Sequence, residues 1–150
     1  MKNKYINFIN VLNKAQDLPL LFLRLILAFG FWDPAKTKWA DIDSVAEWFD
    51  GMGIFAPKLS AYLAASTEMA GVFLLVLGLG TRLICIPLVI TLLVAIKTVH
   101  YENGFAASNN GYEIALYYTL MLITLICFGS GKISLDHLIK RYFLSKQPSV

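Results

Sequence analysis

The stretch LSAYLAASTEMAGVFLLVLGLGTRLICIPLVITLLVAIKTVH (residues 59–100) decides the fold, because it contains two long apolar segments, residues 59–79 and 83–100. Roughly 20 helical residues cross about 30 Å of hydrocarbon, so each segment is long enough for a transmembrane helix. Only Gly80-Thr81-Arg82 separates the two segments. The sequence therefore predicts a tight antiparallel hairpin of two membrane spans.

Further apolar segments flank this hairpin on both sides. Residues 18–39 form a first span if the helix continues through Pro34, and residues 112–128 form a fourth. Residues 134–144 resemble a short surface helix on the cytoplasmic side. No internal repeat or second domain is present. The predicted fold is a single all-α integral membrane domain over residues 1–150, an antiparallel four-transmembrane-helix bundle with short interfacial helices.

A second surface helix is predicted over residues 44–52. Ser44, followed three residues later by Glu47, is a capping box, and the apolar residues after Ser44 recur at helical spacing. Such a helix lies on the outer membrane interface. Its aromatic residues, Trp48 and Phe49, either anchor it among the headgroups or make it a lid over an outward cavity.

The composition also places the chain in a membrane. Hydrophobic residues make up 57% of the sequence and charged residues 15%, and the mean hydropathy is +0.62. A soluble domain of this length needs more polar surface to cover its core. The net charge is only +3 and the basic residues are scattered, which argues against a nucleic-acid partner. The lipid bilayer is the expected surrounding.

Lysine and arginine are unevenly divided between the two sides of the predicted bundle. Cytoplasmic loops and tails carry the excess of these residues in membrane proteins. One side holds eight, which are Lys2, Lys4, Lys14, Arg82, Lys132, Lys140, Arg141 and Lys146. The other side holds four, which are Lys36, Lys38, Lys58 and Lys97. Both termini are therefore predicted to be cytoplasmic, and the loop before the fourth span is predicted to face outward.

Glu68 lies near the middle of the second span, where a short carboxylate cannot reach the headgroup region. Ionisable residues at this depth are costly and usually face a bundle interior or a water-filled cavity. Small residues that permit close helix packing share its helical face; they are Ala64, Thr67, Gly71 and Gly78. Glu68 is therefore either a hydrogen-bonded carboxyl that fixes the packing or a functional group in a polar pocket.

Several further ionisable residues lie near the predicted outward ends of the spans. Lys97 and His100 are three residues apart and project from similar sides of the third span, where Lys97 can extend to the interface. A neutral His100 beside Glu102 or Glu113 could exchange protons or bind a soft metal ion. Lys38 lies near the end of the first span and is expected in the same region, at the outward ends of the spans.

Arg24, Cys85 and Cys127 lie toward the cytoplasmic ends of their spans. For Arg24, extension to the interface or pairing explains the position. The cysteines are either buried structural residues or a dithiol pair. Cys85 and His100 cannot share a metal, because fifteen residues separate them, roughly 22 Å along a helix. The chain lacks HExxH, Walker, GxSxG, dinucleotide-binding and CxxCH motifs.

Some of these residues stand in motifs that carry a family resemblance. The motifs are LFLRLILAFGF (21–31), PAKTKW (34–39), AYLAASTEMAGVFLLVLGLGTRL (61–83), VAIKTVHYENGF (94–105) and NNGYE (109–113). Together they resemble the DoxX family of small bacterial inner-membrane proteins. The segments FWDPAKTKWADIDSVAEWF (31–49) and NGYEIALYY (110–118) are similar to the HvfX-type subgroup, which accompanies clusters that make copper-responsive modified peptides.

The resemblance implies a multi-pass protein of the bacterial inner membrane that works with a protein partner or as a homo-oligomer. It makes quinone and copper the candidate ligands. The imidazole of His100 makes this residue the candidate metal ligand. The residues and the resemblance together give an outward-facing pocket with the candidates Arg24, Lys38, Glu68, Lys97, His100, Asn103, Asn110 and Glu113.

The predicted function is that of an accessory subunit in redox or copper-stress homeostasis, with a link to modified-peptide maturation or export, rather than an independent enzyme. Three alternatives use the same residues differently. A quinone-linked oxidoreductase subunit would use Lys97 and His100 to hold a head group. A transporter or channel component would use the charges as a permeation path. A structural scaffold would use them as packing contacts.

Overall fold

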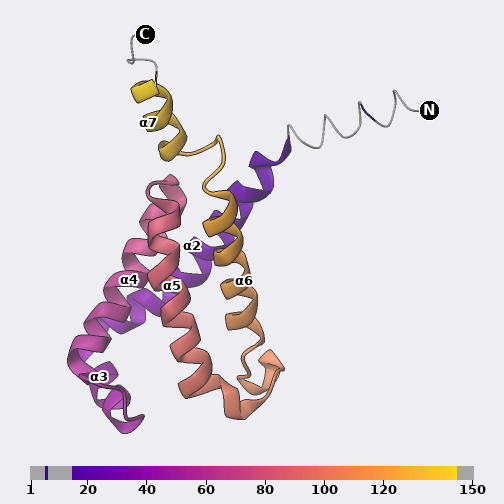
Figure 1. The fold of residues 1–150 in the computed structure, drawn as a ribbon. Coiled ribbons are helices and arrows are strands. Elements are labelled where there is room, and N and C mark those ends of the chain that lie inside the picture. Colours follow the sequence, from indigo (N-terminus) through magenta and orange to yellow (C-terminus); the bar gives the residue numbers. More distant parts are fainter. Residues whose placement is uncertain (1–5, 7–14, 145–150) are drawn as a thin grey trace.

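The computed structural model describes residue 6 and residues 15–144, and every regular element in this part is helical (Figure 1). The elements are α2 (Asp17–Ala40), α3 (Ile42–Gly51), α4 (Pro57–Leu77), α5 (Thr81–Ala95), η1 (Ile96–His100), η2 (Tyr101–Asn103), η3 (Ala107–Asn109), α6 (Glu113–Phe128) and α7 (Leu135–Leu144). The basic residues Lys2, Lys4, Lys14 and Lys146, which contribute to the predicted orientation, lie outside the described residues.

Three helical segments are long and apolar enough to cross a membrane. They are Asp17–Ala40, Pro57–Leu77 and Thr81–Asn103, with 24, 21 and 23 residues. Helix α6 is also apolar but has only 16 residues. The predicted all-helical membrane fold is therefore confirmed. The fourth span and the cytoplasmic termini stay predictions.

The helices pack in pairs, and α4 and α5 are close together only along part of their length. Helix α2 packs along α4, α5 packs along α6, and α3 folds back onto α4. Gly71 lets α4 and α5 approach closely, because a Cβ there would lie 2.9 Å from the Leu88 side chain. Beyond this contact the two helices diverge toward the end that carries α3 (Figure 1). The apolar core, which includes Leu27, Leu75 and Leu122, lies between the paired helices.

Helix α3 begins two residues before the predicted position, at Ile42. The carboxylate of Asp41 caps it by accepting hydrogen bonds from the Ser44 backbone N–H at 3.1 Å and the Ser44 hydroxyl at 2.6 Å. These hydrogen bonds lower the pKa of Asp41. The predicted capping box of Ser44 and Glu47 is therefore wrong, because Ser44 occupies the first helical turn and Asp41 is the cap.

Arg24 joins three segments at the opposite end of the bundle. Its side chain is fully buried and donates hydrogen bonds to the backbone carbonyls of Leu75, at 3.2 Å, and Ile133. Gly78 lies against it with φ +64°, and a Cβ there would collide with the guanidinium and lie 2.6 Å from the Ser134 Cβ. Arg24 is thus paired with backbone carbonyls inside the protein.

Candidate functional site

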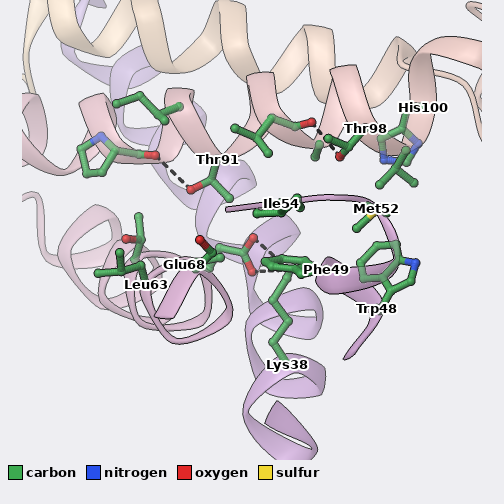
Figure 2. Close-up of a pocket in the computed structure, with 18 of the residues that line it drawn as sticks. Lys38, Trp48, Phe49, Met52, Ile54, Leu63, Glu68, Thr91, Thr98 and His100 are labelled. Atoms are coloured by element: carbon green, nitrogen blue, oxygen red, sulfur yellow. Dashed lines mark hydrogen bonds and ion pairs between the residues drawn. The ribbon is translucent and has the colours of Figure 1, made fainter. Parts of the chain in front are cut away.

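A cavity of about 710 Å³ opens where α4 and α5 diverge (Figure 2). Helices α3, α4 and α5 supply most of its wall, and the segments around Lys38, His100 and Asn110 complete it. We call it the ion-pair cavity. Its apolar and aromatic lining includes Trp48, Phe49, Met52, Ile54, Leu63, Ile90 and Val94.

The cavity is open along the side between α4 and α5. Leu63, Ile90 and Val94 line it there, and these side chains are 59%, 57% and 43% exposed. They belong to two helices that are long and apolar enough to span a membrane. Exposed apolar side chains on a membrane-spanning helix face hydrocarbon, so this part of the lining is suited to contact with lipid.

An ion pair between α2 and α4 lies at the inner wall of the cavity (Figure 2). The Lys38 ammonium donates to both carboxylate oxygens of Glu68, at 2.7 Å and 3.0 Å. The two side chains are only 19% and 6% exposed. Burying a charge is tolerable when an opposite charge and hydrogen bonds compensate it, and this geometry supplies both.

The elements around this pair explain why it forms. Glu68 lies on the buried face of α4 together with Ala65, whose small side chain allows α2 to approach. Lys38 lies in the last turn of α2, one turn beyond Pro34. Two of the three ammonium N–H groups of Lys38 are used by Glu68. The third remains available to a ligand in the cavity.

A π-helix, η1, follows α5 and changes which residues face the cavity. Thr98, Val99 and His100 line the cavity, whereas Lys97 is exposed and does not. A π turn contains more residues than an α turn, so residues three apart no longer share a face. The structure therefore separates Lys97 from His100, which were expected to project from similar sides.

Asn110 holds the ring of His100. The backbone carbonyl of Asn110 lies 2.8 Å from His100 Nδ1. A carbonyl only accepts hydrogen bonds, so Nδ1 carries a proton and donates it to Asn110, and Nε2 is the ring nitrogen left for a ligand. The Asn103 amide also donates to this carbonyl, at 3.3 Å, and to the Val99 carbonyl, at 3.0 Å.

The Asn-Gly pair at residues 110–111 fixes this loop. Asn110 has φ +59°, which asparagine accepts more readily than most residues. A Cβ on Gly111 would collide with the carbonyl of Gly104 and lie 2.6 Å and 2.7 Å from the carbonyl oxygens of Phe105 and Ala106. Only glycine fits there. The loop before α6 is therefore built on a close approach of two backbone segments.

Half of the predicted pocket residues line the cavity. Lys38, Glu68, His100 and Asn110 do, and Lys97, Asn103, Glu113 and Arg24 do not. Glu113 instead orders the loop, because its carboxylate accepts from the Ala107 N–H at 2.9 Å and the Tyr117 hydroxyl at 3.1 Å.

Sequence reasoning missed the face of α5 and η1 that lines the cavity. Pro87, Thr91, Val94 and Thr98 occur at spacings of three and four, which is the period of one helical face. The two threonines in an otherwise apolar span were the available signal. Both hydroxyls donate to carbonyls one turn earlier, at 3.0 Å for Thr91 and 2.9 Å for Thr98, and each retains acceptor capacity.

Possible metal ligands are dispersed in the part of the chain that the structure describes. Within that part, no group of three or more His, Cys, Asp or Glu side chains is placed to hold a metal ion. Cys85 is buried and Cys127 is exposed, and both are free thiols. The role of His100 as a metal ligand stays a prediction.

Long apolar helices that surround a buried ion pair and a laterally open cavity define a helical membrane protein. Comparison with known families gives the more specific assignment. The DoxX family matches residues 19–101, which is more than half of the chain. The chain belongs to the DoxX family.

Relatives of similar length support this assignment. A Haemophilus influenzae protein described as uncharacterized is 34% identical over 136 residues, which cover 88% of this chain and 90% of the relative. The Bacillus subtilis protein named "Putative oxidoreductase CatD" is 29% identical, covering 83% of this chain and 90% of its own. A second uncharacterized Haemophilus influenzae protein is 30% identical, covering 85% and 96%. No solved structure matches the chain.

Proposed function

We propose that the chain is a subunit of a membrane redox system and that the ion-pair cavity holds the head group of a quinone-class carrier. The observation that supports this most directly is the Lys38–Glu68 pair in the wall of an apolar, laterally open cavity. Its volume of about 710 Å³ is in the range of small-molecule sites. The name of the Bacillus subtilis relative belongs to the same class of activity.

The polar groups of the cavity fit both redox forms of such a carrier. The carbonyl oxygens of a quinone need donors, and the third N–H of Lys38 is one. The hydroxyls of a quinol need acceptors, and the Glu68 carboxylate and His100 Nε2 are two. The apolar side chains, among them Phe49 and Leu63, suit a ring and an isoprenoid tail.

Each residue then has a defined task. A quinone, when bound, supplies two-electron, two-proton chemistry. Lys38 orients a ligand oxygen with a charge-assisted hydrogen bond. Glu68 accepts a proton at a carboxylate oxygen, and His100 offers a second acceptor at Nε2 near the loop end of the cavity. Phe49, which is buried, excludes water from that wall.

The cavity lies on the outward side in the topology that we propose. Helix α6 is the fourth span, both termini are cytoplasmic, and the protein resides in the bacterial inner membrane with a protein partner or further copies of itself. The support is the distribution of basic residues and the apolar sequence of α6. A Ser108→Cys variant in a Cys127→Ser background should react with a membrane-impermeant maleimide in spheroplasts. Labelling only after lysis would reverse the orientation.

Quinone binding is measurable through Trp48, which lines the cavity and whose fluorescence a bound quinone quenches. Titration of the purified protein with a ubiquinone carrying two isoprene units is expected to give saturable quenching. Glu68→Gln removes one charged acceptor but retains the shape of the side chain, and we expect about tenfold weaker binding. Trp48→Phe should lose most of the quenching.

The control is Lys58→Met, which removes an exposed lysine that pairs with Asp43 outside the cavity lining and should leave the affinity unchanged. Equal affinity of the wild type and Glu68→Gln would reject the ligand role of the pair. Normal binding combined with low abundance of Glu68→Gln would favour the scaffold alternative.

The copper-stress role, with its link to modified-peptide maturation or export, is the physiological part of the proposal. Cells that carry Glu68→Gln or His100→Ala at wild-type abundance should grow less well under copper or oxidant stress. Sensitivity to oxidant alone would restrict the role to redox homeostasis. Wild-type resistance of both variants would remove the cavity from either pathway.

A further inference from the structure

A second cavity, of about 380 Å³, lies at the opposite end of the bundle from the ion-pair cavity. The loop between α6 and α7 forms much of its wall, and residues from the first turns of α2 and α5 and from α7 complete it. Arg82, Lys132 and Lys140 line it, so we call it the basic cavity. The proposed redox site has no part in its lining.

The two acidic residues of the basic cavity are already occupied. Asp136 accepts hydrogen bonds from the backbone N–H groups of Gly80, at 2.8 Å, and Thr81, at 3.2 Å. Asp17 accepts from the Lys132 N–H at 2.8 Å and pairs with the Lys132 ammonium at 3.5 Å. The carboxylates therefore hold the fold at this end. Of the lysine and arginine side chains that line the cavity, only Lys132 pairs with one of them, so two cations remain.

Arg82 and Lys140 are those remaining cations. Both side chains are exposed, and no carboxylate of residues 15–143 lies within ion-pair distance of either. Arg82 uses one N–H to donate to the Cys127 carbonyl, at 3.1 Å, which fixes the guanidinium at the cavity. Its other N–H groups remain available to an anion.

The glycine loop adds backbone donors to the same wall. Gly129 and Gly131 have φ +81° and +75°, so the chain turns sharply on both sides of Ser130. The N–H groups of Ser130 and Gly131 donate to no acceptor within the described part of the chain. Both residues line the basic cavity, so their N–H groups are donors that a phosphate oxygen there can use.

Helix α7 indicates where the phosphate comes from. It projects beyond the bundle (Figure 1). Its apolar face exposes Leu138, Ile139 and Phe143, at 57%, 45% and 67%. Lys140 and Arg141 lie on its polar face. A short basic amphipathic helix of this kind lies in a membrane interface with its apolar face among the acyl chains. The basic cavity at its base is then at headgroup level.

We propose that the basic cavity binds the phosphate of an anionic phospholipid, and that α7 lies in the interface beside the bound lipid. Arg82 and Lys140 contact the phosphate oxygens, the Ser130–Gly131 N–H groups add neutral donors, and the apolar face of α7 contacts the acyl chains. The lipid holds α7 against the membrane and joins it to the first turn of α5.

Thermal unfolding of the purified protein in detergent tests this proposal. Dioctanoyl phosphatidylglycerol should raise the unfolding temperature, and dioctanoyl phosphatidylcholine at the same concentration should not. Arg82→Gln/Lys140→Gln should weaken the phosphatidylglycerol effect about tenfold or more in apparent Kd, because two charge-assisted contacts are lost. The matched control, Lys36→Gln/Lys58→Gln, removes two exposed lysines at the far end and should retain the wild-type response.

Three results would overturn the proposal. Equal stabilisation by the two lipids would show that the charge is irrelevant. A wild-type response in the double variant would exclude Arg82 and Lys140. Equal protection by inorganic phosphate would identify a free phosphate site instead of a lipid site. If the double variant does not fold, Lys140→Gln alone, an exposed change on α7, gives the same comparison.

Discussion

Replacing Lys38 with methionine is expected to lower the free energy of unfolding by about 3 kcal/mol, because the Glu68 carboxylate then remains buried without its partner. The methionine side chain fills most of the space of the lysine stem, so lost packing contributes little. Equilibrium unfolding in mixed detergent micelles, followed by circular dichroism, measures the change.

Two matched variants separate the charge effect from other causes. Lys38→Met/Glu68→Leu removes both charges and should recover most of the lost stability, since replacing a buried pair by apolar groups is often neutral. Lys58→Met breaks the ion pair with Asp43, whose partners are 69% and 73% exposed, and should change the unfolding curve little. If Lys38→Met and the double variant lose the same free energy of unfolding, lost packing and not the unpaired charge is the cause.

The second large effect is expected for Gly78→Ala. A methyl group there would collide with the buried guanidinium of Arg24 and lie 2.6 Å from the Ser134 Cβ, and the residue has φ +64°. Backbone strain and displacement of a buried charge act together, so the expected loss is about 3 kcal/mol or more. The same unfolding measurement applies, and the yield of folded protein gives a second readout.

Gly80→Ala is the natural control because it lies in the same turn. Gly80 has φ +57°, but a Cβ there would have no neighbour within 4 Å. Only the backbone strain of about 1 kcal/mol is then expected. If both variants lose the same stability, the contact between Gly78 and Arg24 is not a critical packing point.

The helices were the most predictable part of the fold. Long apolar runs can satisfy their backbone hydrogen bonds in a membrane only as helices, so composition and length were enough to place them. Glu68 was recognisable for a similar reason, because a carboxylate in the middle of a span must face other protein groups or water. The free-energy cost of exposing backbone polar groups or a carboxylate to hydrocarbon was enough to predict both the helices and the buried position of Glu68.

The contacts between side chains of different helices, and the direction in which each side chain points, were less predictable. Lys38 and Glu68 were both candidates, but only the packing of α2 on α4 shows that they contact each other. The π-helix separates Lys97 from His100. No residue type in the segment 96–100 predicts a π-helix in place of an α-helix. Glu113 accepts a hydrogen bond from the Ala107 backbone N–H, an outcome that depends on the fold of residues 104–112. These features arise from tertiary geometry.

The lateral opening beside Leu63, Ile90 and Val94 determines which concentration a ligand of the ion-pair cavity experiences. A carrier that enters from the bilayer partitions into it first, so occupancy follows its mole fraction among the lipids and not its aqueous concentration. Dilution of the membrane by added lipid or detergent would then weaken apparent binding even at a constant bulk amount of carrier. The affinity of the cavity for such a carrier is therefore best expressed as a density of the carrier in the membrane. The carrier reaches the cavity by diffusion in the plane of the bilayer.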